Sequence, residues 1–128
     1  MPAVTILYAG LLGLLSIVLS STAGMSRGRK GIDAGDGGDA TLLLAMRRHA
    51  NFVEYVPMAL VLIGLLELNG VSGQVIHGLG CVLLAGRLLH AANFHQGVRS
   101  IPRGIGAALT LLVIATSSVW SIAVFLAP

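Results

Sequence analysis

The sequence predicts an all-α integral membrane protein, a bundle of four membrane-spanning helices that forms a single domain over residues 1–128. Three observations predict this class: 55% of the 128 residues are hydrophobic, 10% are charged, and the mean hydropathy is +0.90. Such a composition is typical of a chain whose solvent is lipid. The low charge excludes a disordered chain, and the single cysteine, Cys81, excludes a disulfide-stapled fold.

Four apolar segments are long enough to cross a hydrocarbon core of about 30 Å, since a helix rises about 1.5 Å per residue. Residues 2–26 and 104–127 contain no charge at all. Residues 24–39 combine six glycines with charged residues and predict a solvated loop, while Asn69-Gly70 predicts a turn. Asp39 can cap the second helix, and Pro102 suits the first turn of the fourth. We therefore predict helices at about 3–25, 40–68, 71–94 and 102–127.

A cleaved signal peptide is the alternative for the first segment, but residues 1–4 lack the basic start that such a peptide has. The basic residues also predict a topology. All eight lie in or beside the first and third connections: Arg27, Arg29, Lys30, Arg47, Arg48, Arg87, Arg99 and Arg103.

The positive-inside rule places these two connections in the cytoplasm and both termini on the other side. We therefore expect a multi-pass protein of the inner (cytoplasmic) membrane. Nucleic acid is not an expected partner, because no basic run is interleaved with aromatic residues.

Two polar stripes near the predicted cytoplasmic surface are the candidate site. At 100° per residue, Arg47, Asn51 and Glu54 share one face of the second helix, and Arg87 and His90 lie near the end of the third. A charged group at membrane depth costs a few kcal/mol and so needs a partner or a task. If the stripes face each other, they enclose a slot that suits a small zwitterion, and its cations would lower the pKa of a bound thiol.

From spacing alone, a structural alternative stays open. Arg47 and Glu54 could neutralise each other through intermediate partners, and the basic residues could be interfacial anchors that reach lipid phosphate.

Polar residues elsewhere predict structural roles. Cys81 lies in an apolar run and is expected to be an inert packing thiol, and His77 a satisfied or interfacial imidazole. Tyr8 and Trp120 are expected to anchor the membrane interface, and Glu67 to mark the outer end of the second helix. No residue spacing predicts a metal site.

A specific motif now identifies a resemblance. The segment RRHANFVEYVP (residues 47–57), followed by GRLLH (residues 86–90), contains R-x-x-x-N-x-x-E-Y-x-P and G-R-x-x-H. This pattern resembles the MAPEG family, the membrane-associated proteins in eicosanoid and glutathione metabolism, and looks most similar to bacterial members. The resemblance extends over nearly the whole chain. It implies a homotrimer of four-helix subunits, with glutathione held between neighbouring subunits near the cytoplasmic face.

The resemblance also implies roles for individual residues. Arg103 matches the arginine that stabilises the glutathione thiolate, and either Arg27 or Arg29 resembles the family's basic residues after the first helix. Phe94 and Gly104 depart from the family, standing where some relatives have Tyr and Ser, which argues against a prostaglandin or leukotriene reaction. The residues implied to bind glutathione are Arg47, Asn51, Glu54, Tyr55, Arg87, His90 and Arg99.

The expected function is that of a glutathione-dependent transferase or peroxidase acting on lipophilic electrophiles that arrive from membrane lipid. The alternative is a non-catalytic oligomeric membrane protein that binds a small anion, a lipid headgroup or a protein partner. A small drug exporter ranks last, since it would need an acidic residue in the first helix and residues 2–26 contain none.

Overall fold

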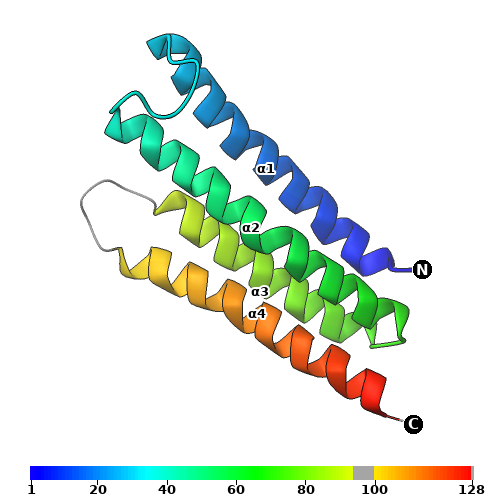
Figure 1. Ribbon diagram of the computed structural model, residues 1–128. Helices are drawn as coiled ribbons and strands as arrows, with labels where there is room; N and C mark the ends of the chain where they lie inside the picture. Colours follow the sequence, from blue (N-terminus) through cyan, green and yellow to red (C-terminus); the bar gives the residue numbers. More distant parts are fainter. Residues whose placement is uncertain (94–99, 128) are drawn as a thin grey trace.

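The computed structural model describes residues 1–93 and 100–127, which form four helices and no strand (Figure 1). The helices are α1 (Ala3–Lys30), α2 (Ala40–Leu68), α3 (Gly73–Ala92) and α4 (Ile101–Leu126). Each is long and apolar enough to cross a membrane. The predicted all-α class with four membrane-spanning helices is therefore confirmed.

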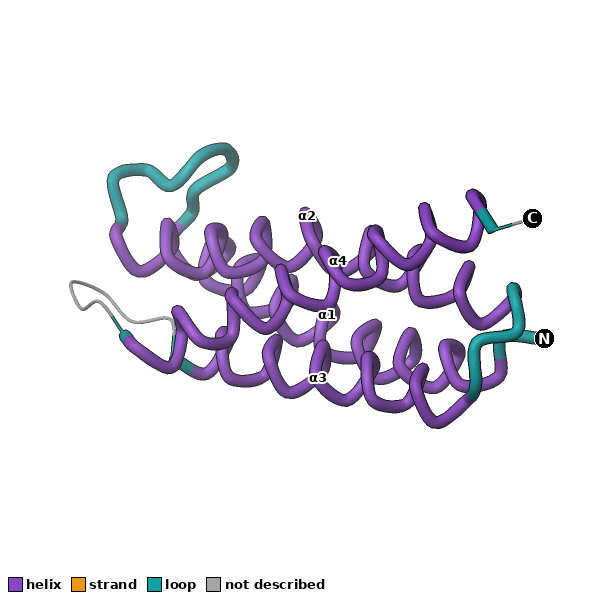
Figure 2. Tube along the Cα trace, turned by 90° about the horizontal axis from the view of Figure 1, so that it is seen from below, coloured by secondary structure: helices purple, strands orange, loops and turns teal. Residues whose placement is uncertain are grey.

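The four helices run side by side as a bundle whose two ends differ (Figures 1 and 2). Helices α2 and α3 contact each other in the middle, and each also contacts both α1 and α4, whereas the described parts of α1 and α4 do not touch. Both termini and the 69–72 turn lie at one end, called here the terminal end. The connection 31–39 and the start of α4 lie at the opposite end, called the loop end.

Helix α1 continues to Lys30, so the prediction of a loop from residue 24 was wrong. Gly24 and Gly28 are accommodated within the helix, because glycine weakens a helix without breaking it. The helix ends at Gly31 with φ 62°, where the amides of Gly31 and Ile32 donate to the carbonyls of Gly28 and Arg27.

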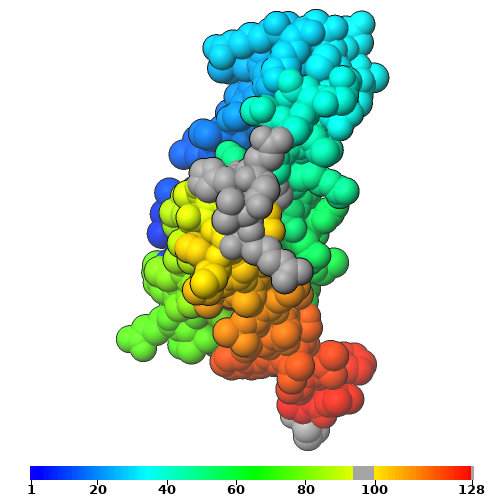
Figure 3. All heavy atoms as spheres, turned by 90° about the vertical axis from the view of Figure 1, so that its left-hand side faces the viewer, coloured from blue at the N-terminus to red at the C-terminus, as the bar shows by residue number. Residues whose placement is uncertain are grey.

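The extended α1 carries its basic residues beyond the apolar part of the bundle. Its 28 residues span about 42 Å, more than the hydrocarbon core of about 30 Å. Positive side chains in the last turn also favour the helix dipole. In Figure 3, the α1–α2 connection (cyan) accordingly projects at the loop end.

Helix α2 begins as the sequence predicts, because Asp39 accepts a hydrogen bond of 2.8 Å from the Leu42 amide. The carboxylate of Asp39 also forms an ion pair with Lys30, which joins the end of α1 to the start of α2. The Lys30 ammonium and the Leu42 amide together hold the pKa of Asp39 below its ordinary value. This pair fixes the two ends of the glycine-rich connection.

The other boundaries differ slightly from the prediction. Helix α3 begins at Gly73 instead of residue 71, and α4 begins at Ile101 with Pro102 in its first turn. The predicted end of the third helix at residue 94 lies outside the described residues.

Helices α3 and α4 approach closely through two glycines. A Cβ atom on Gly106 would lie 2.5 Å from the Gly86 carbonyl oxygen and 2.7 Å from the His90 amide nitrogen. No other residue type fits without moving the backbone. Large apolar side chains fill the interior of the bundle, among them Leu12, Phe52, Val56, Ile63, Leu83 and Val113.

At the terminal end, polar side chains are satisfied across helices. The Glu67 carboxylate of α2 accepts hydrogen bonds from the amides of Val4 and Thr5, both 2.8 Å, and from the Thr5 hydroxyl at 2.6 Å. Glu67 therefore does more than mark the end of α2. It caps the first turn of α1, whose amides have no partner within their own helix.

Tyr8 is buried, at 4% exposure, so its expected role as an interface anchor was wrong. Its ring lies over Gly80, and its hydroxyl donates to the His77 carbonyl at 3.2 Å. The same hydroxyl lies 3.1 Å from His77 Nδ1 and 2.9 Å from Cys81 Sγ. His77 is thus a satisfied imidazole. Cys81 is exposed, which corrects its expected place in the packing.

Candidate functional site

A groove opens between α2 and the start of α4 at the loop end. It encloses about 320 Å³, and its polar lining consists of Arg47, Asn51 and Glu54 from α2 and Arg103 from α4. The three α2 residues are spaced by four and three positions and therefore share one helix face. We call this feature the α2–α4 groove.

The α2–α4 groove combines both signs of charge with an amide. Arg47 and Glu54 are exposed, and Asn51 and Arg103 are half-buried. Guanidinium groups form paired hydrogen bonds with carboxylates, and an ionised glutamate attracts an ammonium group. The lining is therefore suited to a ligand that carries carboxylate and ammonium groups together.

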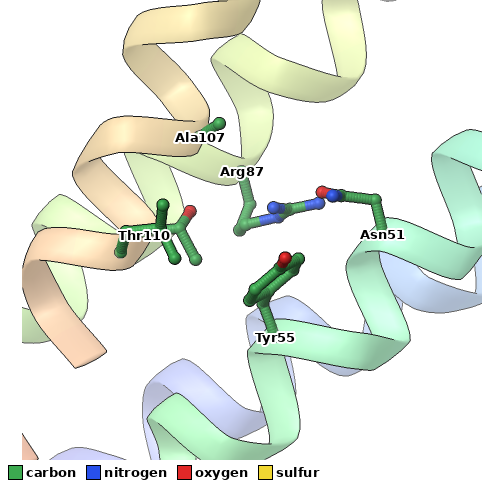
Figure 4. Close-up of a pocket in the computed structure, with 6 residues that line it drawn as sticks. Asn51, Tyr55, Arg87, Ala107 and Thr110 are labelled. Atoms are coloured by element: carbon green, nitrogen blue, oxygen red, sulfur yellow. The ribbon is translucent and has the colours of Figure 1, made fainter. Parts of the chain in front are cut away.

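A smaller hollow, the inner cavity, lies deeper along the same pair of helices (Figure 4). It encloses about 60 Å³ and is lined by Asn51, Tyr55, Arg87, Ala107, Thr110 and Leu111. Asn51 lines both the inner cavity and the α2–α4 groove, so the two hollows share this residue.

Arg87 of α3 reaches into the inner cavity from the core, and its guanidinium points toward Asn51 (Figure 4). The side chain is 1% exposed and lies over the Phe52 ring, 5.4 Å from its centroid. Two of its nitrogens, Nε and Nη2, have no hydrogen-bond partner among the described residues, and the same holds for the buried Oδ1 of Asn51. This cation is held by packing and by the aromatic face of Phe52.

The two predicted polar stripes do not enclose one slot. Asn51 and Arg87 meet in the inner cavity, but the other stripe residues separate. His90 is 4% exposed, lies against Gly106 at the α3–α4 contact, and lines neither hollow. The close approach of the two glycines draws His90 into that interface. Tyr55 lines the inner cavity but not the α2–α4 groove.

Some site residues were missed by sequence reasoning, and others fall outside the described ranges. Thr110 of α4 lines the inner cavity, and its hydroxyl donates to the Gly106 carbonyl at 3.0 Å. Its spacing of seven from Arg103, about two helical turns, was the available signal. Arg99 and Phe94 lie outside the described residues.

A further groove of about 310 Å³ lies between α1 and α2 and includes Arg27 and His49. Arg27 is directed toward α2, because Nη2 contacts Met46 Sδ at 3.6 Å while Nη1 donates to the Asp33 carbonyl at 3.4 Å. Arg29 is exposed. Of these two arginines, Arg27 therefore faces the bundle.

Comparison with known proteins gives the family. The model of the MAPEG family matches residues 5–123. Inner membrane protein YecN of Escherichia coli strain K12 is 40% identical over 116 residues, 88% of each chain, and YecN of Escherichia coli O6:H1 strain CFT073 matches equally well. With its four apolar helices, the chain is a multi-pass membrane protein. It belongs to the MAPEG family.

Proposed function

We propose that this protein is a membrane-bound, glutathione-dependent transferase or peroxidase that acts on lipophilic electrophiles. The observation that carries the proposal is the lining of the α2–α4 groove, where Arg47, Arg103, Asn51 and Glu54 surround one opening. The groove lies at the loop end, beside exposed apolar helix faces such as those of Leu43 and Ile105. A polar and a lipophilic reactant could meet there.

Glutathione matches this lining group by group. The tripeptide has two carboxylates, which suit guanidinium groups such as that of Arg47, and one ammonium group, which suits Glu54. Its amides can pair with the Asn51 side chain. Binding in the groove would hold the tripeptide against the lipid phase and raise the local concentration of the two reactants.

Arg103 is the proposed catalytic residue. A guanidinium beside the glutathione sulfur would favour the thiolate, which is the nucleophilic form. In conjugation, the thiolate forms a sulfur–carbon bond with the electrophile, and the leaving group departs with the electron pair of the broken bond. Arg103 lies in the first turn of α4 and lines the groove, which supports this role.

The remaining family-matched residues are proposed to act around this centre. Tyr55 and Arg87 support the groove from the inner cavity, through the Asn51 amide that both hollows share. His90 fixes the α3–α4 contact behind them. Arg99, outside the described residues, is proposed to add positive charge at the mouth of the groove.

We further propose that the protein works as a homotrimer in the inner membrane, with the loop end in the cytoplasm and both termini outside. The basic residues gathered at the loop end support this orientation. The relatives named above are inner membrane proteins. Large exposed apolar side chains on all four helices support burial against lipid and neighbouring subunits.

The test is the thiolate absorbance that develops when glutathione is added to detergent-purified protein at neutral pH. We expect a saturable signal in the wild type and its loss in Arg103→Ala, with glutathione binding weakened no more than about tenfold. Arg29→Ala removes an exposed arginine outside the groove and should keep the full signal. Binding without a thiolate signal in the wild type would refute thiol activation.

Such a result would favour the second candidate, a non-catalytic oligomeric protein that binds a small anion, a lipid headgroup or a protein partner. The apolar residue Phe94 favours it, because some relatives have a tyrosine hydroxyl at this position. This candidate predicts that ligands raise the unfolding temperature with no turnover of electrophiles, whereas the enzyme shows both.

A further inference from the structure

Phe52 of α2 is a core residue that contacts one of the site residues. Its side chain is 3% exposed and packs within the apolar core. The Arg87 guanidinium lies over its ring, 5.4 Å from the centroid. Phe52 follows Asn51 directly in α2, so the two side chains point about 100° apart, and Phe52 lines neither the inner cavity nor the α2–α4 groove. Phe52 can therefore affect a ligand there through Arg87.

The ring of Phe52 compensates the buried charge of Arg87. Among the described residues, five others line the inner cavity, and none of them is a carboxylate. The face of an aromatic ring carries negative potential and attracts a cation, most strongly where water is excluded. Arg87 is 1% exposed, so its contact with Phe52 is made in such a place.

An aromatic partner leaves the N–H groups of a guanidinium open, whereas a carboxylate would occupy them. Carboxylates bind a guanidinium at its edge through paired hydrogen bonds, and an aromatic ring offers no such acceptor. Nε and Nη2 of Arg87 accordingly have no hydrogen-bond partner among the described residues. The charge is thus stabilised while these donors stay available.

The guanidinium of Arg87 is directed at Asn51. It points toward the Asn51 side chain (Figure 4), whose buried Oδ1 also has no hydrogen-bond partner in the described part of the chain. Asn51 lines the α2–α4 groove as well, so the orientation of Arg87 affects the amide that the groove presents. Arginine has a long side chain with several rotatable bonds, and fixing it before a ligand arrives lowers the entropic cost of binding.

We propose that Phe52 is a positioning residue for glutathione. Its ring holds the Arg87 guanidinium toward Asn51 and keeps the N–H donors open, so that the site has its binding shape before the tripeptide enters. This role rests on the proposed function, in which glutathione binds in the α2–α4 groove. Because Phe52 acts on binding through Arg87, its loss should weaken glutathione affinity without changing thiolate formation in the bound state.

The experiment replaces Phe52 by phenylalanines that carry one, two or three ring fluorines. Each fluorine weakens the attraction of the ring for a cation and changes the size of the ring little. Calorimetric titration of detergent-purified protein with reduced glutathione should show a Kd that rises with each fluorine, by about tenfold in total. The thiolate absorbance at saturating glutathione should stay at the wild-type value, because Arg103 is the residue proposed to stabilise the thiolate.

Two controls show whether the effect belongs to this contact. The same fluorine series at Phe125, which is 85% exposed near the end of α4, should leave the Kd for glutathione unchanged. In Arg87→Met, which removes the cation, fluorines at position 52 should no longer change the Kd.

The outcomes separate this role from the proposed function. If the wild type binds glutathione and the Kd is the same throughout the Phe52 series, Phe52 has no positioning role and the glutathione site stands. A dependence on fluorine that persists in Arg87→Met would also overturn the inference, because the ring would then act by another route. If the wild type binds no glutathione, the proposed function fails and the positioning role fails with it.

Discussion

The carboxylate of Glu67 at the terminal end accepts three hydrogen bonds from α1, whereas Arg87 toward the loop end keeps two nitrogens without partners among the described residues. At the terminal end, the Tyr8 hydroxyl and the His77 ring likewise lie within hydrogen-bonding distance of each other. Toward the loop end, the buried Oδ1 of Asn51 has no hydrogen-bond partner among the described residues. A protein normally pairs its buried polar groups, so those it leaves open are the ones available to ligands. The polar groups of Glu67 and Tyr8 at the terminal end therefore have a structural role, and we propose that those toward the loop end bind a ligand.

The largest expected effect is that of Glu67→Ala, which removes the cap from the first turn of α1. We expect a loss of about 2 to 3 kcal/mol in the free energy of unfolding, because two backbone amides and a hydroxyl lose a charged acceptor. Thermal unfolding in detergent measures it. The matched variant at the other end, Glu54→Ala, should weaken glutathione binding instead and change stability by less than about 0.5 kcal/mol. If Glu54→Ala lowered the stability and Glu67→Ala weakened glutathione binding, the proposed difference in role between the two ends would be wrong.

A smaller effect is expected from Tyr8→Phe, which keeps the buried ring but deletes the hydroxyl between His77 and Cys81. We expect a loss of about 1 kcal/mol, the usual contribution of a neutral hydrogen bond. Denaturant or thermal unfolding measures it, and glutathione affinity should stay unchanged. If Tyr8→Phe changed the affinity for glutathione and left the free energy of unfolding unchanged, a ligand would bind at the terminal end, and the contrast between the two ends would be wrong.

The smallest effect concerns pH and the Asp39–Lys30 pair. The pKa of Asp39 is lowered in the folded protein, so its charge stabilises the fold above the ordinary carboxyl pKa. This stabilisation is lost as pH falls below about 4. The wild type should therefore unfold at a slightly higher temperature than Asp39→Asn at pH 7, and this difference should shrink as the pH falls from the ordinary carboxyl pKa through the lowered pKa of the folded protein. A difference that does not shrink in acid would exclude the charge as its cause.

The helices could be predicted from the sequence because the length of an apolar segment is a local property. The stripe formed by Arg47, Asn51 and Glu54 could also be predicted, since helical periodicity alone places these residues on one face. The end of α1 could not, because two glycines inside a long apolar helix look like the start of a loop.

The contacts between helices could not be predicted from the sequence. Glu67 and Thr5 are 62 positions apart, and only the relative height of α1 and α2 brings them together. The separation of His90 from the α2–α4 groove likewise depends on how closely Gly86 and Gly106 approach. Local patterns give the face of each helix, but these inter-helix distances follow from packing of the whole bundle.

The contact between Gly86 and Gly106 also constrains how the molecule can move. With backbone atoms of α3 and α4 this close, sliding or rotating one helix against the other would produce immediate collisions. The two helices must therefore travel as a rigid unit. Any widening that admits a bulky molecule between α2 and α4 therefore requires α2 to move relative to the α3–α4 pair.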